Sequence, residues 1–158
     1  MTQTIAAKKS LYEQDLNLWL ETANAQLKSR DLQDLDIDNL IEELEGLAGR
    51  DRRELKERLT TLLEHLLKRC YVNMPDCYDS WEETINRTRN AIADILAQSP
   101  SLKNYVNSPE LFQKAFADAL KVVKKNKGYS RVDFPDVWQF SYDIYPLLNV
   151  DFWEITEK

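Results

Sequence analysis

Glycine, proline, cysteine and histidine are all scarce in this chain of 158 residues, which holds three, five, two and one of them. So few glycines and prolines favour helices over turn-rich sheets. A single histidine cannot build a histidine-rich metal site or the H-E-x-x-H motif of zinc proteases. The two cysteines, Cys70 and Cys77, match neither a C-x-x-C motif nor the spacing of zinc ligands.

Long apolar runs and an excess of positive charge are missing too. No window approaches 18 consecutive apolar residues, so we expect no membrane span. No apolar segment follows the N-terminal lysines, so the start is not a secretory signal, and we expect a cytoplasmic protein. The net charge of -6 makes nucleic acid an unfavoured partner, because duplex-binding proteins present cations to the phosphates. Glycine-rich phosphate loops and nucleotide fingerprints are absent as well, so we expect no cofactor.

The remaining composition is that of a globular helical protein. Hydrophobic residues make up 43% and charged residues 30%, which is too apolar for a disordered chain. The length is that of a single domain. We therefore expect one all-α domain over 1–158, a compact helical bundle of about four main helices with a short aromatic C-terminal region. Residues 1–9 are expected to be a disordered N-terminus.

The longest predicted helix runs over about 38–70 and is opened by Asp36 or Asp38 as its N-cap. The apolar residues before and after Gly46 and Gly49 keep the same helical register. This favours one continuous helix, with or without a kink. At ~100° per residue, eight residues share one face of this helix: Ile41, Leu44, Ala48, Leu55, Leu59, Leu62, Leu66 and Cys70. Residues 31–45 hold seven acids and no base, as the dipole at a helix N-terminus prefers.

Capping signals and hydrophobic spacing place the other elements. They predict helices over about 11–29, 81–98 and 109–127, a loop over 70–80, and one or two short helices that begin near Pro135 and Pro146.

Several short motifs carry a resemblance to a known family. In order they are Tyr12 with Asp15, Leu16 and Trp19, then LDIDNLIEELE, RRELKERL, LLEHLLK, SWEETI with Arg89, and SPSL. In that order and spacing, the chain resembles the bacterial family catalogued as domain of unknown function twenty-nine. The likeness runs from roughly Tyr12 to Leu102 and resumes at Phe134-Pro135.

The resemblance implies an all-helical fold and a bacterial, cytoplasmic protein. It carries over no catalytic residue, because the family has no agreed activity. Two positions depart from the family pattern. Ala48 stands where the family usually has glycine, and Val137-Trp138-Gln139 replaces a Cys-Pro-aromatic motif.

Four glutamates raise the possibility of a metal-dependent hydrolase of a nucleotide or phosphoester. Glu42 with Glu45, and Glu54 with Glu57, form two E-x-x-E pairs, which is the kind of acidic pairing that can hold Mg²⁺. The pairs lie twelve residues apart, about 18 Å along a continuous helix. A solvated helix face with i,i+4 ion pairs explains most of these charges and is the favoured interpretation.

A few charges fall on or near apolar stripes and need partners if they are buried. Arg89 aligns with Ile85, Ile92 and Leu96, and we expect it to pair with a carboxylate of the acidic helix. The resulting candidate polar cluster, structural or functional, comprises Glu42, Glu43, Glu45, Arg52 and Arg89.

Two further features of the sequence are candidate interaction surfaces. A basic run without an intervening acid comprises Lys121, Lys124, Lys125, Lys127 and Arg131, and it either contacts an acidic partner or balances a helix dipole. The aromatic tail, with Trp138 and Trp153, either caps the open end of the core or binds a partner. The cap and the dipole are the favoured interpretations. The lone His65 is expected to be a structural residue at the margin of the apolar face.

These features favour a non-enzymatic protein-interaction or regulatory module that binds another protein or itself as a homodimer. The alternative is the metal-dependent hydrolase.

Overall fold

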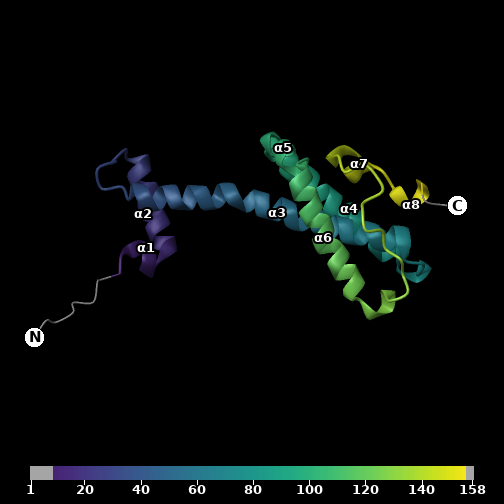
Figure 1. Cartoon of the computed structure of the whole chain (residues 1–158). Coiled ribbons are helices and arrows are strands. Elements are labelled where there is room, and N and C mark those ends of the chain that lie inside the picture. Colours follow the sequence, from purple (N-terminus) through teal and green to yellow (C-terminus); the bar gives the residue numbers. More distant parts are fainter. Residues whose placement is uncertain (1–8, 156–158) are drawn as a thin grey trace, which may run out of the picture. The chain divides into compact units, whose positions relative to one another are not determined.

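A computed structural model of the chain describes residues 9–155 (Figure 1). The N-terminus expected to be disordered, 1–9, lies outside these residues except for Lys9. Over the described range the chain forms helices, turns and loops and no strand, which confirms the all-α fold. Four of the described helices are longer than ten residues: α2 (Leu16–Lys28), α3 (Ile37–Tyr71), α4 (Pro75–Gln98) and α6 (Pro109–Lys125). None of the helices within 9–155 has the length and apolarity needed to cross a membrane.

The chain divides into two compact units, with the boundary between Gly49 and Arg50 inside α3. We describe them separately as the N-terminal unit and the C-terminal unit. The expectation of a single domain remains a prediction.

The N-terminal unit begins with two short-range caps. Ser10 Oγ accepts a hydrogen bond from the Glu13 amide at 3.4 Å and opens α1 (Leu11–Gln14), as its capping box predicts. The predicted helix over 11–29 is wrong in one respect, because α1 ends at Gln14 and a second helix begins after Asp15. The backbone of Asp15 is extended, and its carboxylate accepts from the Leu18 amide at 3.0 Å. Asp15 therefore ends one helix and caps the next, and an unbroken hydrophobic spacing does not reveal this.

Asp36 connects α2 to the start of α3. Its carboxylate caps α3 by accepting from the Asn39 amide at 3.4 Å and from Asn39 Nδ2 at 2.7 Å. It also accepts from Trp19 Nε1, on α2, at 3.2 Å. The hydrogen bonds, that from the Asn39 side chain foremost, lower the pKa of Asp36 below its ordinary value. One carboxylate thus starts α3 and holds α2 against it.

The long helix is a single element, as the preserved register predicts, and it continues through Gly46 and Gly49 without a break. The predicted loop over 70–80 is wrong, because α4 already begins at Pro75. Proline is well tolerated in the first turn of a helix, where its missing N–H has no intrahelical acceptor. Only residues 72–74 separate α3 from α4.

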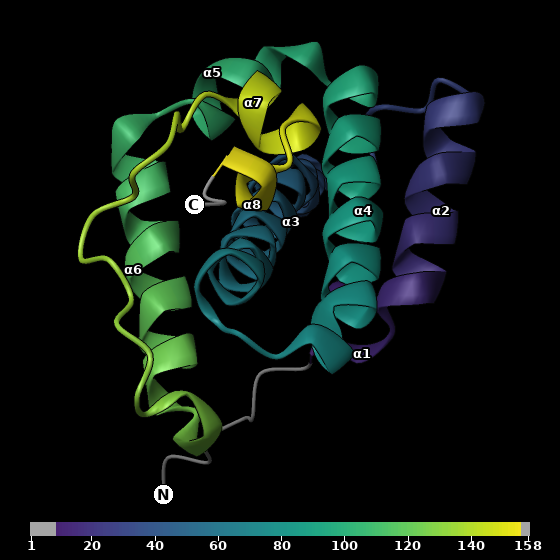
Figure 2. The same cartoon turned by 90° about the vertical axis from the view of Figure 1, so that its right-hand side faces the viewer.

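The C-terminal unit is built around the second half of α3. Figure 2 looks almost along this helix and shows α4 and α6 on opposite sides of it. Six leucines of α3 are fully buried there: Leu55, Leu59, Leu62, Leu63, Leu66 and Leu67. η1 (Pro100–Leu102) and α5 (Lys103–Val106) connect α4 to α6, whose N-cap is Ser108, as predicted.

The C-terminal region closes this unit. After η2 (Lys127–Tyr129) the chain runs without a helix to α7 (Ile144–Asn149), and α8 (Phe152–Ile155) follows. The short helix near Pro146 is therefore confirmed as α7. The one expected near Pro135 does not form, and its neighbours Phe134 and Trp138 pack into the core from an irregular segment.

Candidate functional site

The apolar face of α3 is covered over only part of its length. Residues eighteen positions apart on an α-helix are separated by about five full turns, so they occupy the same face. Four such pairs lie along α3: Ile37 with Leu55, Ile41 with Leu59, Leu44 with Leu62, and Ala48 with Leu66. The second member of every pair is fully buried. The first members are exposed, at 53% for Ile37, 48% for Ile41 and 57% for Leu44.

We call Ile37, Ile41, Leu44 and Ala48 the bare stripe. The face of α3 that meets α1 and α2 is a different one, because it carries Asp36, Asn39 and Glu43 in place of these apolar residues. The bare stripe therefore has the character of a core-facing surface but no neighbour within the N-terminal unit.

The segment that carries the bare stripe is strongly acidic. Residues 1–49 contain four Lys or Arg and ten Asp or Glu, a formal charge of -6. Residues 50–158 contain seventeen of each sign, so the whole net charge of the protein belongs to the first 49 residues. Among the described residues, no carboxylate of this N-terminal segment takes part in an ion pair.

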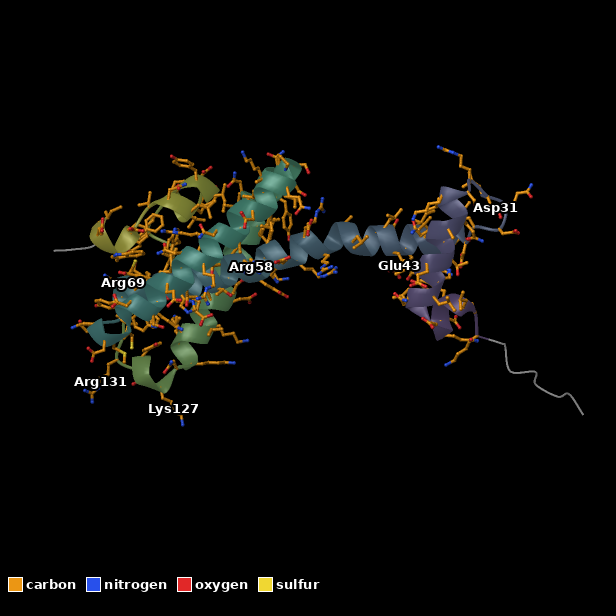
Figure 3. All side chains as sticks on the ribbon, turned by 180° about the vertical axis from the view of Figure 1, so that it is seen from behind. Asp31, Glu43, Arg58, Arg69, Lys127 and Arg131 are labelled. Atoms are coloured by element: carbon orange, nitrogen blue, oxygen red, sulfur yellow. The ribbon has the colours of Figure 1, made fainter. Side chains whose placement is uncertain are left out.

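The three glutamates of the predicted polar cluster have different environments. Glu42 and Glu45 are exposed. Glu43, labelled in Figure 3, is half-buried and accepts a hydrogen bond from the Tyr12 hydroxyl at 2.5 Å. This hydrogen bond raises the pKa of Tyr12 to about 12. The Tyr12 ring also meets Trp19 edge-on, with the ring centroids 4.9 Å apart. Glu43 is therefore a structural partner of α1, while Glu42 and Glu45 are free to meet another molecule.

The glutamates proposed for the hydrolase are spread along one helix. Glu42, Glu45, Glu54 and Glu57 all belong to the continuous α3, and Glu54 accepts from Arg58 Nε at 3.0 Å. Within 9–155 there is no group of three or more His, Cys, Asp or Glu residues that could hold a metal ion. The geometry gives the hydrolase no support.

Arg52 interacts within the C-terminal unit. Its guanidinium lies over the ring of Tyr105, 5.4 Å from the centroid, and its backbone oxygen accepts from the Tyr105 hydroxyl at 3.3 Å. These contacts join α3 to α5.

Arg89 is buried and paired, but its predicted partners were wrong. Its guanidinium donates to Asp151 Oδ1 at 2.9 Å and to the Leu147 carbonyl oxygen at 2.9 Å. It donates to the Val150 carbonyl oxygen as well. The carboxylate is therefore Asp151, in the C-terminal region, instead of Glu42, Glu43 or Glu45. A charge on a core-facing stripe indicates that a partner exists but does not indicate which of many acids supplies it.

Two arginines lie within cation–π distance of Trp153. The guanidinium of Arg69, on α3, is 5.2 Å from the Trp153 ring centroid, and that of Arg89, on α4, is 5.9 Å away. Arg69 also donates to Glu82 at 2.8 Å and stacks on the ring of Tyr78 at 3.8 Å. The cation–π contacts thus attach α8 to α3 and α4, and the Arg89 hydrogen bonds attach α7 and residues 150–151 to α4. No pattern in the sequence distinguishes Arg69 as a residue of this kind.

The basic run is exposed at the end of α6 and on η2. Lys121, Lys125, Lys127 and Arg131 are exposed, and Lys124 reaches Asp136 at 3.5 Å. Lys127 and Arg131 project outward in Figure 3. The placement of Lys124 and Lys125 in the last turn of α6 is what dipole compensation requires.

The two tryptophans of the aromatic tail are core residues, each 8% exposed. Trp138 packs edge-on against Phe116 and Phe152, and its Nε1 donates to the Ser141 carbonyl oxygen at 3.2 Å. Beside Trp138 runs a shallow groove of about 590 Å³ between α6 and residues 136–142. The tail packs as a cap on the core, and this groove lies beside it.

His65 lies at the margin of the core, where Nδ1 is 2.9 Å from the Thr61 carbonyl oxygen. Burial lowers the pKa of His65 below its ordinary value. The imidazole is therefore a half-buried structural group on α3.

Comparison with known proteins gives one result beyond the structure. No curated protein and no solved structure matched the chain. A family model matched residues 11–153, which is most of the sequence and includes the bare stripe, Arg89 and Trp153. The chain therefore belongs to the family described as Domain of unknown function DUF29.

Proposed function

We propose that this protein is a non-enzymatic protein-interaction module whose N-terminal unit docks a partner. One observation carries the proposal: the described part of this unit buries two apolar side chains, Trp19 and Ala23, and exposes ten large ones. The exposed set is Leu11, Leu16, Leu18, Leu20, Leu27, Leu32, Ile37, Ile41, Leu44 and Leu47.

A unit with so small a core gains little from its own packing. Segments of about 40 residues usually need a metal, disulfides or a partner to become stable. A surface rich in uncovered leucine and isoleucine is also the usual mark of a binding site. Fully burying one such side chain contributes about 1.5–3 kcal/mol. A partner that covers the bare stripe would supply the packing that the unit lacks.

The most reactive groups of the described residues serve the fold, and this supports a binding role over catalysis. Burial raises the pKa of the Cys70 thiol to about 12, which disfavours the thiolate that a nucleophile needs. The one imidazole hydrogen-bonds to the backbone of its own helix.

Site-specific photo-crosslinking tests the proposal in the cells that make the protein. A photoreactive amino acid replaces Leu44, in the bare stripe, or Asn86, an exposed residue of α4 that serves as the matched control. We expect one discrete protein adduct at position 44 and none at position 86. Adding Ile41→Gln should abolish the adduct, since it removes a neighbouring apolar contact.

Two outcomes would count against the proposal. One is the absence of any adduct at position 44 while the protein is folded. The other is the same set of adducts at both positions, which would indicate random collisions with abundant proteins.

A further inference from the structure

We infer that the partner of the bare stripe is a basic amphipathic helix of another protein. This inference rests on the proposed function and adds the chemistry of the partner. Three properties of the described residues lead to it: the shape of the stripe, the charge at its border, and the consequence of pairing it with itself.

The stripe has the shape that receives one helix. Its members, Ile37, Ile41, Leu44 and Ala48, follow the i, i+4, i+7, i+11 spacing of a single helical face. From Ile37 to Ala48 they span eleven helical steps, about 16 Å along the axis at 1.5 Å per residue. A partner helix of about three turns matches this length, and its own apolar face would complete the packing.

The border of the stripe is acidic. At ~100° per residue, Asp38 and Glu45 adjoin one side of it, and Glu42 lies next to them. All three are exposed, and none has an ion pair among the described residues. No Lys or Arg occurs between Asp31 and Gly49 to balance them. The complementary cations must therefore come from the partner, where they fix orientation and increase the association rate.

A second copy of the chain fits this surface poorly. If two bare stripes pair antiparallel, the flank with Asp38, Glu42 and Glu45 in one copy lies along the same flank of the other. In a parallel pair, neither copy brings a Lys or Arg between positions 31 and 49 to balance these acids. Like charges brought together across an interface are unfavourable. Nucleic acids and anionic membranes carry the same sign of charge and are disfavoured for the same reason.

Binding of two synthetic peptides to the full chain tests the inference. Both are about fourteen residues long and place leucines on one helical face. The polar face is lysine in one peptide and glutamate in the other. Titration calorimetry at low salt should show the lysine peptide binding at a ratio of one to one. The glutamate peptide should not bind, and added salt should weaken the lysine complex.

Two double variants separate the apolar from the charged contribution. Ile41→Gln with Leu44→Gln keeps every charge, and it should weaken binding of the lysine peptide about tenfold or more. Glu42→Gln with Glu45→Gln keeps the apolar stripe, and it should weaken binding and reduce its dependence on salt. Asp94→Asn, on the exposed face of α4, is the matched control and should leave binding unchanged.

Three results would overturn the inference. They are equal affinity for both peptides, no binding of either, and lysine-peptide binding that survives loss of Ile41 and Leu44. Sedimentation of the free chain adds a fourth: a dimer that the Ile41→Gln and Leu44→Gln variant disperses would identify a second copy as the occupant. The crosslink at position 44 distinguishes these failures from failure of the proposed function. A discrete heterologous adduct there would keep the docking role even if the partner is not basic.

Discussion

Ile41 and Leu59 occupy the same face of one continuous helix, eighteen residues apart, yet Ile41 is 48% exposed and Leu59 is fully buried. The difference lies in what covers each residue, because α4 and α6 enclose the second half of α3 (Figure 2). The bare stripe has no such cover within its own unit. Each buried residue of the four pairs therefore has an exposed counterpart on the same face of α3, and the two can be compared by mutagenesis.

Truncating the two members of one pair should have very different effects. Leu62→Ala removes a fully buried side chain and should lower the free energy of unfolding by about 2–5 kcal/mol. Leu44→Ala removes a side chain that is 57% exposed and should change it by no more than about 0.5 kcal/mol. Chemical denaturation of the purified protein measures both. Comparable losses would show that the stripe is covered in the free protein.

Removing the buried guanidinium should loosen the C-terminal region. Arg89→Met leaves the carboxylate of Asp151 and two backbone carbonyls without their donor, and it should cost about 3 kcal/mol. The matched control is Arg87→Met, because Arg87 pairs with Glu83 on the exposed side of the same helix. That change should cost less than about 1 kcal/mol. Equal melting temperatures for the two variants would contradict a structural role for Arg89.

The sequence predicted which residues form the apolar face of α3 but not which part of that face other helices cover. Hydrophobic period identifies which residues share a face, and the continuity of the helix from Ile37 to Tyr71 followed from that period. Which half of the face is buried depends on helices that return from far along the chain. The same limit explains why the partner of Arg89 was predicted wrongly. The sequence shows that Arg89 needs a partner, but Asp151, which supplies the carboxylate, lies 62 residues away.

Tyr12 should titrate only at high pH. The hydrogen bond to Glu43 raises the pKa of Tyr12 from 10.0 to about 12. Folding therefore favours the protonated phenol. The stabilisation is fully present below pH 10 and is lost as the pH rises through about 12. The difference in ultraviolet absorbance between the wild type and Tyr12→Phe should show a phenolate appearing with a midpoint near 12. A midpoint near 10 would mean that Tyr12 and Glu43 do not interact in solution.

The thiol of Cys70 should react slowly in the folded protein. Burial raises the pKa of Cys70 from 9.0 to about 12, which lowers the thiolate fraction at neutral pH roughly a thousandfold. In a Cys77→Ser variant, alkylation reports on Cys70 alone. The native protein should be alkylated far more slowly than the same variant in denaturant. Similar rates in both states would contradict the burial of this part of α3.

Local capping chemistry accounts for two further differences between prediction and structure. Asp15 interrupts the first predicted helix because its carboxylate caps a new one, and Pro75 starts α4 because its ring suits a first turn. Both signals were present in the sequence, but each also fits a loop. The packing of Phe134 and Trp138 from an irregular segment has no periodic signal at all.

Hydroxyl-radical footprinting tests the docking surface most directly, with Leu62 as an internal reference. In the purified protein, side chains of the bare stripe should be oxidised readily and Leu62 should be protected. In extract of the cells that make the protein, we expect protection of residues 37–48 with little change elsewhere on the exposed surface. Equal oxidation of Ile41 and Leu44 in the extract and in isolation, in protein that remains folded, would mean that no partner covers the bare stripe.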